Sequence, residues 1–523
     1  MMPIKKSTFS SPSNRSVSRN RGFAKSITTL AVGLLLLASP AVAQESGVSG
    51  ITHHQRNYPS GPPYSTTPSA ETFKFRDLRN ELRNKMTGTY TVTSAGDLYF
   101  RVPQSQRMSP QLRDLLRNAD TTVGNLEGGM MVYPADRAKD VADMGFDLLA
   151  PGEDASVAGY EARAKYLLPL GPKVAGAGLT LDEARRPQFQ EVPQGLVALL
   201  HACPGNGLCG SAATNGGVRP AIAGVNQLGL TVWNTVTRDQ FNQLKAMRDS
   251  VLARRTEPDV LEPSSLPPHE PPGRLVFYDQ NFMVADKPGD IHYELDPADE
   301  QAEILAVRNA KEVADFVIFH MHNHYNRHAF QLYSTDSYPA DFMQPFIHKL
   351  IDNGLDMYFG TGNHNMQGIE IYKGRPIFYN QGNMGEDLQR AIDSPANPEN
   401  LTGTESRERG DIAYHWNDIT GVAYVANTTY KDGRLVEIRI YPVDIGLGQR
   451  PWSRENIPQT PTPEKARAIL ERIQKISEPF GTKISIENNI GIIRVPSEAT
   501  VEVSGGDIPG RQPRQPKPET KKD

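Results

Sequence analysis

Four histidines lie within nine residues of this chain, in the stretch F-V-I-F-H-M-H-N-H-Y-N-R-H from Phe316 to His328. They are four of only 12 histidines in 523 residues, and they begin where an apolar run ends. Side chains alternate along an extended strand, so His320, His322 and His324 are predicted to lie on one face. Imidazoles bind metal ions and transfer protons near neutral pH. We therefore predict a functional cluster here, the alternative being a polar, pH-sensitive surface patch.

Three further polar clusters come directly after predicted strands. They are Asp97 in S-A-G-D-L, Asn125 and Glu127 in V-G-N-L-E-G-G, and His364 in F-G-T-G-N-H-N-M-Q-G-I-E. Loops at strand ends are where α/β folds hold ligands. Carboxylates and imidazoles together suit a divalent ion, for which Mn²⁺, Zn²⁺ and Mg²⁺ are the candidates. Such an ion would lower the pKa of a bound water and polarise a phosphoryl oxygen.

Each of these three clusters also has a structural interpretation. Gly-Asp after a strand is commonly a turn, and a single loop histidine such as His364 is more often hydrogen bonded than metal bound. His328 and His348 are predicted to be structural or surface residues. The functional interpretation therefore depends on the clusters meeting in space.

The elements that would position these residues alternate between strand and helix, which indicates an α/β fold. Thr87–Asp97 and Gly195–His201 are predicted strands, and a helix is predicted from Ser109 at its N-cap to Asp120, with Pro110 at its first position. Further strands are predicted over residues 121–127, 315–319, 357–359, 375–379, 421–425 and 435–442. Further helices are predicted over residues 302–314, 340–353 and 463–477, and a hairpin over 484–495.

Composition excludes some classes of function. The formal net charge of -4 and the isoelectric point near 6.3 leave no basic excess to neutralise phosphates, so a nucleic-acid binder is not expected. Hydrophobic residues make up 38% and charged residues 22%, as in a globular protein. The length exceeds what one ordinary core serves.

The N-terminus is predicted to be a secretory signal peptide over residues 1–43. Arginines and a lysine precede the apolar run Ile27–Ala38, and Ala41 and Ala43 occupy the small-residue positions of a cleavage site. The run is short for a membrane span, and an uncleaved anchor is the alternative. We expect an exported bacterial protein, periplasmic or secreted, that meets the membrane only through this peptide.

Composition predicts the character of three further segments. Residues 44–87 are predicted to be a polar lead-in and residues 251–274 contain a proline-rich connection. Residues 496–523 are expected to be a disordered tail. Cys203 and Cys209 flank a Pro- and Gly-containing loop. In an oxidising compartment they are predicted to form a disulfide, the alternative being a metal site completed by ligands from elsewhere.

Six motifs resemble those of a known family. They are G-D-L at Gly96, G-N-L-E-G at Gly124, V-A-G-A-G-L-T-L-D-E-A-R-R-P at Val174, F-V-I-F-H-M-H at Phe316, I-D-N-G-L-D-M-Y-F-G-T-G-N-H at Ile351 and Q-G-I-E-I-Y-K-G-R-P-I-F-Y-N-Q-G-N-M at Gln367. In this order they resemble the CapA family of capsule or poly-γ-glutamate biosynthesis proteins, relatives of the calcineurin-like metallophosphatases. The resemblance covers roughly residues 88–495.

The resemblance implies a four-layer α/β sandwich, two sheets enclosed by helices, with a metal site at the strand ends. The domain would span residues 88–445, with residues 446–495 as its C-terminal extension. The implied metal ligands are Asp97, Glu127, Glu153, His320, His322 and His364. The implied catalytic residues are His320, His322, His324 and Asn125.

The chain departs from the family pattern at two places. Pro151, Gly152 and Glu153 stand where family members carry Asn-Asn-His, and Gly360-Thr361 replaces a Gly-His pair. Glu153 offers a carboxylate in place of one missing imidazole. Losing ligands weakens metal binding.

Two functions therefore stay open. One is a metal-dependent hydrolase or transferase acting on phosphate or amide bonds of an anionic envelope polymer, or on a phosphorylated small molecule. The other is a non-catalytic exported factor that uses the same cleft to hold a polymer or partner.

Overall fold

The computed structural model describes ten stretches of the chain. They are residues 81–99, 103–127, 134–151, 156–205, 212–253, 271–278, 280–328, 336–386, 421–446 and 457–496. The chain divides into Met1–Tyr64 and Ser65–Asp523, and every described residue belongs to the second unit. No helix within these stretches is long and apolar enough to cross a membrane.

Several predictions fall on residues outside these stretches. The signal peptide, most of the lead-in and the C-terminal tail do so, as do Glu153 and Cys209. The metal-ligand role of Glu153 and the Cys203–Cys209 disulfide therefore remain predictions.

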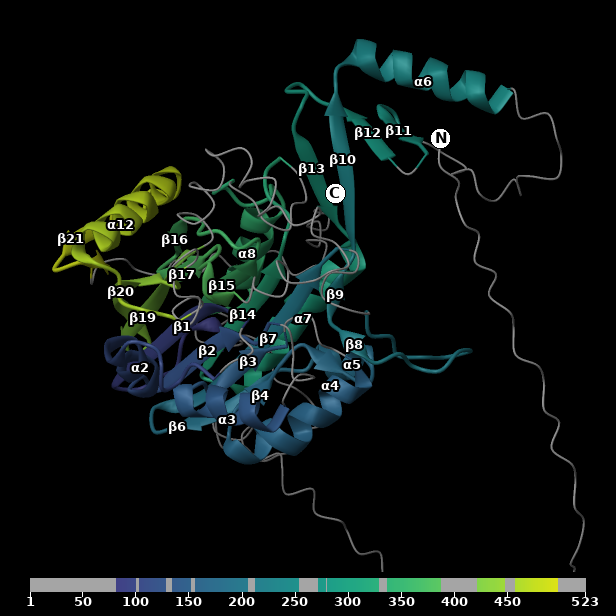
Figure 1. The fold of residues 1–523 in the computed structure, drawn as a ribbon. Helices are drawn as coiled ribbons and strands as arrows, with labels where there is room; N and C mark the ends of the chain where they lie inside the picture. The colour runs from purple at the N-terminus through teal and green to yellow at the C-terminus, as the bar shows by residue number, and fades with distance from the viewer. Residues whose placement is uncertain are drawn as a thin grey trace, which may run out of the picture. The chain divides into compact units, whose positions relative to one another are not determined.

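Two large sheets form the body of the protein (Figure 1). The first has the strand order β21-β22-β20-β19-β1-β2-β3-β4, with β18 also paired to β1. Its strands are β1 (Thr89–Tyr99), β2 (Thr121–Asn125), β3 (Leu148–Ala150), β4 (Lys173–Val174), β18 (Asn383–Glu386), β19 (Val422–Lys431), β20 (Arg434–Asp444), β21 (Ser485–Glu487) and β22 (Ile490–Arg494). Strands β1 to β4 run parallel, so their carboxyl ends lie at one edge.

The second sheet has the order β16-β17-β15-β14-β7-β6, with β9 also paired to β7. Its strands are β6 (Gln188–Val192), β7 (Gly195–Pro204), β9 (Gln227–Leu228), β14 (Phe316–Asn323), β15 (Met357–Gly362), β16 (Ile369–Tyr372) and β17 (Arg375–Phe378). The central strands β7, β14, β15 and β17 are parallel. This sheet therefore also gathers its carboxyl ends at one edge.

Three apolar layers confirm the predicted four-layer sandwich. One lies between the sheets, where Val92 and Val123 of the first sheet join Leu199 and Ile318 of the second. Helices α2 (Pro110–Arg117) and α3 (Pro134–Met144) cover the outer face of the first sheet, and α7 (Pro297–Val313) and α8 (Met343–Asp352) cover that of the second. Helix α12 (Pro463–Ser477) adds Leu470 to the layer between the sheets.

Alternation along the second sheet turns the layer between the sheets from apolar to polar. In β14, Phe316 and Ile318 join that layer, whereas Val317 and Phe319 face the helices. The next residue on the inner face is His320, which is fully buried. The inward-facing residues of β7 follow the same pattern. Apolar residues come first along the strand, and His201 follows them at the position that pairs with His320.

Two glycines let β18 approach the end of β1. Strand β19 pairs with β1 from Thr89 to Ser94, and β18 takes over from Asp97, which is opposite Asn383. A Cβ on Gly96 would lie 1.8 Å from the backbone oxygen of Gly382. That oxygen accepts a 3.0 Å hydrogen bond from the Asp97 amide, so the close approach brings Asp97 beside Asn383.

A smaller sheet over residues 230–295 was not predicted. Its order is β11-β12-β10-β13, from β10 (Leu230–Val236), β11 (Arg274–Phe277), β12 (Gln280–Val284) and β13 (Ile291–Leu295), and α6 (Arg238–Ala253) packs against β11 and β12. The prolines between α6 and β11 indicated only a connecting segment, so the sequence pattern did not predict this sheet. The described part also contains the short elements β5 (Ala177–Gly178), β8 (Gly224–Val225), α4 (Val157–Ala162) and α5 (Leu181–Ala184), a π-helical segment (Arg163–Leu167) and two 3-10 helices (Leu168–Leu170 and Glu478–Phe480).

Most predicted elements are confirmed, including α2 with Pro110 at its first position and α12 over residues 463–477. Several boundaries are wrong: α7 begins at Pro297 rather than at residue 302, and β19 extends to Lys431 rather than ending at residue 425. One of these errors concerns the site. The strand predicted over residues 315–319 extends to Asn323 because His320 to Asn323 continue the ladder with Phe359 to Gly362 of β15. His320 and His322 therefore lie within a strand rather than after it.

We predict that Gly96→Ala lowers the free energy of unfolding by about 3 kcal/mol, because the new methyl group overlaps backbone that cannot move aside. Urea unfolding followed by circular dichroism measures the change. Gly481→Ala is the matched control: its φ of 73° strains an alanine, but no atom lies within 4 Å of the added Cβ, so a loss of about 1 kcal/mol is expected. Equal losses in the two variants would contradict the steric explanation.

Candidate metal centre

The functional side chains come together where the carboxyl ends of the parallel strands of both sheets meet. Asp97 of β1 and Asn125 of β2 are direct register partners in the first sheet. A hydrogen bond of 3.1 Å from the Gly362 amide of β15 to Asp97 Oδ2 joins the two sheets at this point. The convergence predicted from the sequence is therefore observed for these strands.

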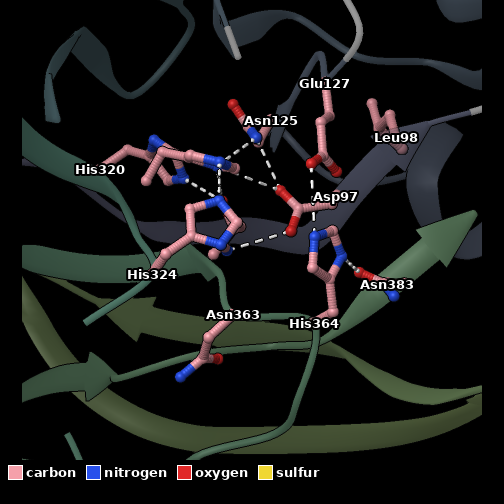
Figure 2. A network of polar contacts seen from close by, with 12 residues as sticks. Asp97, Leu98, Asn125, Glu127, His320, His324, Asn363, His364 and Asn383 are labelled. Carbon is pink, nitrogen blue, oxygen red and sulfur yellow. Dashed lines mark hydrogen bonds and ion pairs between the residues drawn. The ribbon is translucent and has the colours of Figure 1, made fainter. Parts of the chain in front are cut away.

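Three ligand atoms there could hold one cation. One atom each from Asp97, Glu127 and His364 lies within 4.8 Å of the others, and all three residues are buried (Figure 2). Two carboxylates and an imidazole are donors that fit Zn²⁺ or Mn²⁺. Burying two carboxylates so close together is costly without a positive charge between them. The donor set thus fits the divalent ion expected from the sequence.

Asp97 is fully buried, and its neighbours hold it in the ionised form. Its Oδ1 accepts a 2.6 Å hydrogen bond from Asn125 Nδ2. Burial by itself raises the pKa of the Asp97 carboxyl, but the adjoining His322 imidazole and Asn125 amide more than offset it, so the pKa lies below its ordinary value. A permanent negative charge at this position favours a cation.

His364 is oriented by a neighbour outside the ligand group. Its backbone adopts a φ of 53°, unusual for a residue with a side chain. Asn383 Oδ1 lies 2.9 Å from His364 Nδ1 and can accept its proton. This leaves the Nε2 lone pair to face Glu127, whose Oε1 is 3.7 Å away. Such outer hydrogen bonds fix the tautomer and direction of metal-binding histidines.

Arg137 of α3 ties together the backbone that carries the two carboxylates. Its guanidinium donates to the Leu98 carbonyl at 2.8 Å and also to the Glu127 carbonyl. Leu98 follows Asp97, so one buried side chain fixes the ends of β1 and β2 relative to each other. The spacing of the two carboxylates depends on this contact.

His322 and His324 lie beside the ligand group. His322 Nδ1 is 3.0 Å from Asn125 Nδ2 and 3.6 Å from Asp97 Oδ1. Its Nε2 is 2.9 Å from His324 Nε2, and the His324 ring stands next to His364 with the ring centroids 5.6 Å apart. The structure therefore brings both residues to the site.

His320 is the inward-facing residue that precedes His322 on β14, and its side chain contacts His201 and Thr361. His201 Nδ1 and His320 Nδ1 are 2.8 Å apart, and Thr361 Oγ1 is 3.1 Å from His320 Nε2. Burial lowers the pKa of His201 to about 3 and that of His320 well below 6.5. Both rings are therefore neutral at neutral pH.

The other two histidines considered above lie apart from this group. His328 is more than half exposed and contacts Asp290. His348 on α8 stacks on Tyr372 with ring centroids 3.6 Å apart and contacts Glu370 at 2.8 Å. These contacts agree with the structural or surface roles predicted for them.

Sequence analysis missed three residues of the site. His201 ends an apolar strand just as His320 does, which was a usable signal. Thr361 was noted only as a departure from a family motif, yet its hydroxyl lies 3.1 Å from both His320 Nε2 and His322 Nδ1. Asn383 belongs to the Q-G-N-M motif, but only the pairing of β18 with β1 reveals its place beside His364.

Similar proteins point to one family. The family model described as "Bacterial capsule synthesis protein PGA_cap" matches residues 85–387, more than half of the 523-residue chain. The protein y4sH of Sinorhizobium fredii is 28% identical over 469 residues, covering 82% of this chain and 98% of its own length. A "Probable polyglutamine synthesis accessory protein" of Mycobacterium tuberculosis is 28% identical over 205 residues, covering 38% of this chain and 44% of its own length.

Among solved structures, the NAD nucleotidase of Haemophilus influenzae aligns with a TM-score of 0.27 and 9% identity, over 74% of this chain and 57% of that one. The family model covers every described residue of the candidate centre, from Asp97 to Asn383. The family predicted from the motifs is thereby confirmed, and the chain belongs to the bacterial capsule synthesis family PGA_cap.

Proposed function

We propose that this chain is an exported, divalent-metal-dependent hydrolase that cleaves a phosphate or amide bond in an anionic envelope polymer or a phosphorylated small molecule. The observation that carries the proposal is the convergence of Asp97, Glu127 and His364, with ligand atoms within 4.8 Å of one another in a buried position. Manganese, zinc and magnesium are the candidate ions, and Glu153 remains a candidate further ligand.

A bound ion would supply an activated water and would polarise the oxygen of the bond to be cleaved. The residues of the chain orient the components. Asn125 and the Gly362 amide each donate to one oxygen of Asp97, which fixes the direction of the carboxylate. His322 and His324 lie next to it and can hold or give a proton at their ring nitrogens.

The polymer assignment draws on the family. Capsule synthesis is in the description of the matching family model, and polyglutamine synthesis is in the name of the mycobacterial relative. Export draws on the N-terminal pattern, and an oxidising destination would favour the Cys203–Cys209 disulfide. Poly-γ-glutamate is the first polymer to test.

A non-catalytic polymer-binding factor is the second candidate. It is favoured by the environment of Thr361, which stands where the family carries a histidine and makes hydrogen bonds with His320 and His322. Imidazoles bonded in this way are less available to a second ion. Such a protein would keep the fold without turnover.

We predict that the protein purified without chelator contains one tightly bound divalent ion per chain, and that Asp97→Ala or His364→Ala lowers its affinity at least about a hundredfold, because each removes one of three ligands. Elemental analysis and chelator competition measure this. His328→Ala is the matched control, since its side chain is more than half exposed. A metal-free wild type would favour the second candidate.

Ion removal should also lower thermal stability, because the ion binds only the folded chain. At a free ion concentration about a hundredfold above Kd, binding contributes about 2.7 kcal/mol to the free energy of unfolding. We expect a chelator to lower the melting temperature of the wild type by several degrees and to leave that of Asp97→Ala unchanged. An equal shift in both would place the ion elsewhere.

For activity, we expect metal-dependent release of inorganic phosphate from a generic aryl phosphate or metal-dependent shortening of poly-γ-glutamate. Either activity should fall at least about a hundredfold in His364→Ala. A metal-loaded wild type that binds poly-γ-glutamate without cleaving it, and is inactive on phosphate esters, would support the non-catalytic candidate.

A further inference from the structure

Strand β13 of the smaller sheet contacts the loop that begins at His324. Tyr293, in the middle of β13, is buried. Its hydroxyl donates a 2.9 Å hydrogen bond to the backbone carbonyl of Asn326. Its ring meets the Tyr325 ring edge-on, with the ring centroids 5.4 Å apart. One side chain of the smaller sheet therefore contacts both of the residues that follow His324.

The position of Tyr293 is itself fixed by several contacts. Its backbone amide donates a 3.0 Å hydrogen bond to Asp341 Oδ1, and the other carboxylate oxygen of Asp341 lies 2.6 Å from His292 Nδ1. The Phe342 ring also packs edge-on against Tyr293, with the ring centroids 6.0 Å apart. A buried tyrosine hydroxyl needs a hydrogen-bond partner, and the Asn326 carbonyl supplies it. The ring and the hydroxyl therefore have one defined direction.

The same contact extends toward the loop that carries His364. Asn326 forms an isolated β-bridge with Pro339. The carbonyl of the preceding residue, Tyr338, accepts a 3.2 Å hydrogen bond from Gln367 Nε2. Gln367 lies three residues after His364. Contacts thus run from the smaller sheet, across residues 338–339, to the loop of a candidate metal ligand.

The hydrogen bonds within the His324 loop are local. The Tyr325 amide donates to Asn323 Oδ1 at 3.0 Å, and the His328 amide donates to Asn326 Oδ1 at 3.1 Å. Each of these bonds spans two residues, so it shapes the turn without fixing the turn relative to the sheets. The bond from Tyr293 instead spans 33 residues and comes from a different sheet. Loops at functional sites depend on such contacts with a rigid scaffold.

We propose that Tyr293 is a positioning residue, which holds the loop after His324 in a fixed place beside the candidate metal centre through its hydrogen bond to the Asn326 carbonyl. The smaller sheet thereby serves the site, although the ligand group of Asp97, Glu127 and His364 contains none of its residues. A group misplaced by about 1 Å can lower a rate about a hundredfold. The effect on turnover rests on the proposed function, whereas the holding of the loop does not.

Hydrogen exchange in the full-length, metal-free protein tests whether Tyr293 holds the loop. Tyr293→Phe keeps the ring and removes only the hydroxyl. We expect the amides of residues 325–328 to exchange about fivefold faster in this variant, because one hydrogen bond of ordinary net strength is lost. Mass spectrometry of peptides from the exchanged protein measures the rates. Unchanged exchange would overturn the proposal.

Tyr90→Phe is the matched control. The Tyr90 hydroxyl is also buried and makes a 2.9 Å hydrogen bond with Thr121 Oγ1, which lies at the start of β2, whereas the candidate centre lies at the strand ends. This variant should lose a similar amount of thermal stability and leave the exchange of residues 325–328 unchanged. An equal increase of exchange in both variants would indicate general loosening and would also overturn the proposal.

Turnover then tests the positioning role. We expect Tyr293→Phe to lower kcat about tenfold for metal-dependent cleavage of an aryl phosphate, with KM and ion content unchanged, because only the placement of the loop changes. Tyr90→Phe should keep the kcat of the wild type. A wild-type kcat in Tyr293→Phe would overturn the positioning role.

The two measurements also distinguish this inference from the proposed function. If the wild type cleaves nothing, the proposed function fails, and hydrogen exchange alone decides whether Tyr293 holds the loop. If the wild type shows metal-dependent turnover while exchange in Tyr293→Phe is unchanged, this inference alone fails.

Discussion

The site depends on one buried carboxylate that must remain charged. Asp97 is fully enclosed and lies between the two sheets, so each of its oxygens needs a donor or a cation. Asn125 of its own sheet and the Gly362 amide of the other supply two donors. A single charge thereby couples two strands that are far apart in sequence. It also determines which way the Asn125 amide points, because an ionised carboxylate can only accept a hydrogen bond.

The level at which the layer between the sheets turns polar explains where the imidazoles gather. The inward-facing residues that come before His201 and His320 along their strands are apolar, and these Val, Leu, Ile and Phe side chains exclude water from the space between the two sheets. Beyond them, His201, His320 and Thr361 occupy the inward positions of neighbouring strands and are buried too. Polar groups in such a place must find partners among themselves. The dense hydrogen bonding of the histidines is therefore a consequence of their depth as much as of their chemistry.

Local patterns predicted much of this architecture. The proline at the start of α2, the alternation of strand and helix, and the motif order led to the correct family and sandwich. Contacts between strands distant in sequence were not predictable in the same way. Nothing local indicates that β18 replaces β19 beside Asp97, or that His201 meets His320. The sheet over residues 230–295 was not predicted because the prolines before β11 indicated only a connecting segment.

His364 and the pair His320 and His322 make different contacts, and this difference bears on where an ion binds. His364 turns Nδ1 toward Asn383, so its Nε2 lone pair faces Glu127. In contrast, both nitrogens of His320 and of His322 already lie within hydrogen-bond distance of neighbours. An ion at those rings would have to displace existing hydrogen bonds and leave their partners buried without replacement, which costs free energy for each group. We therefore expect the first ion to bind beside the carboxylates of Asp97 and Glu127. Asp97 already carries a negative charge there, and the Nε2 lone pair of His364 already faces Glu127.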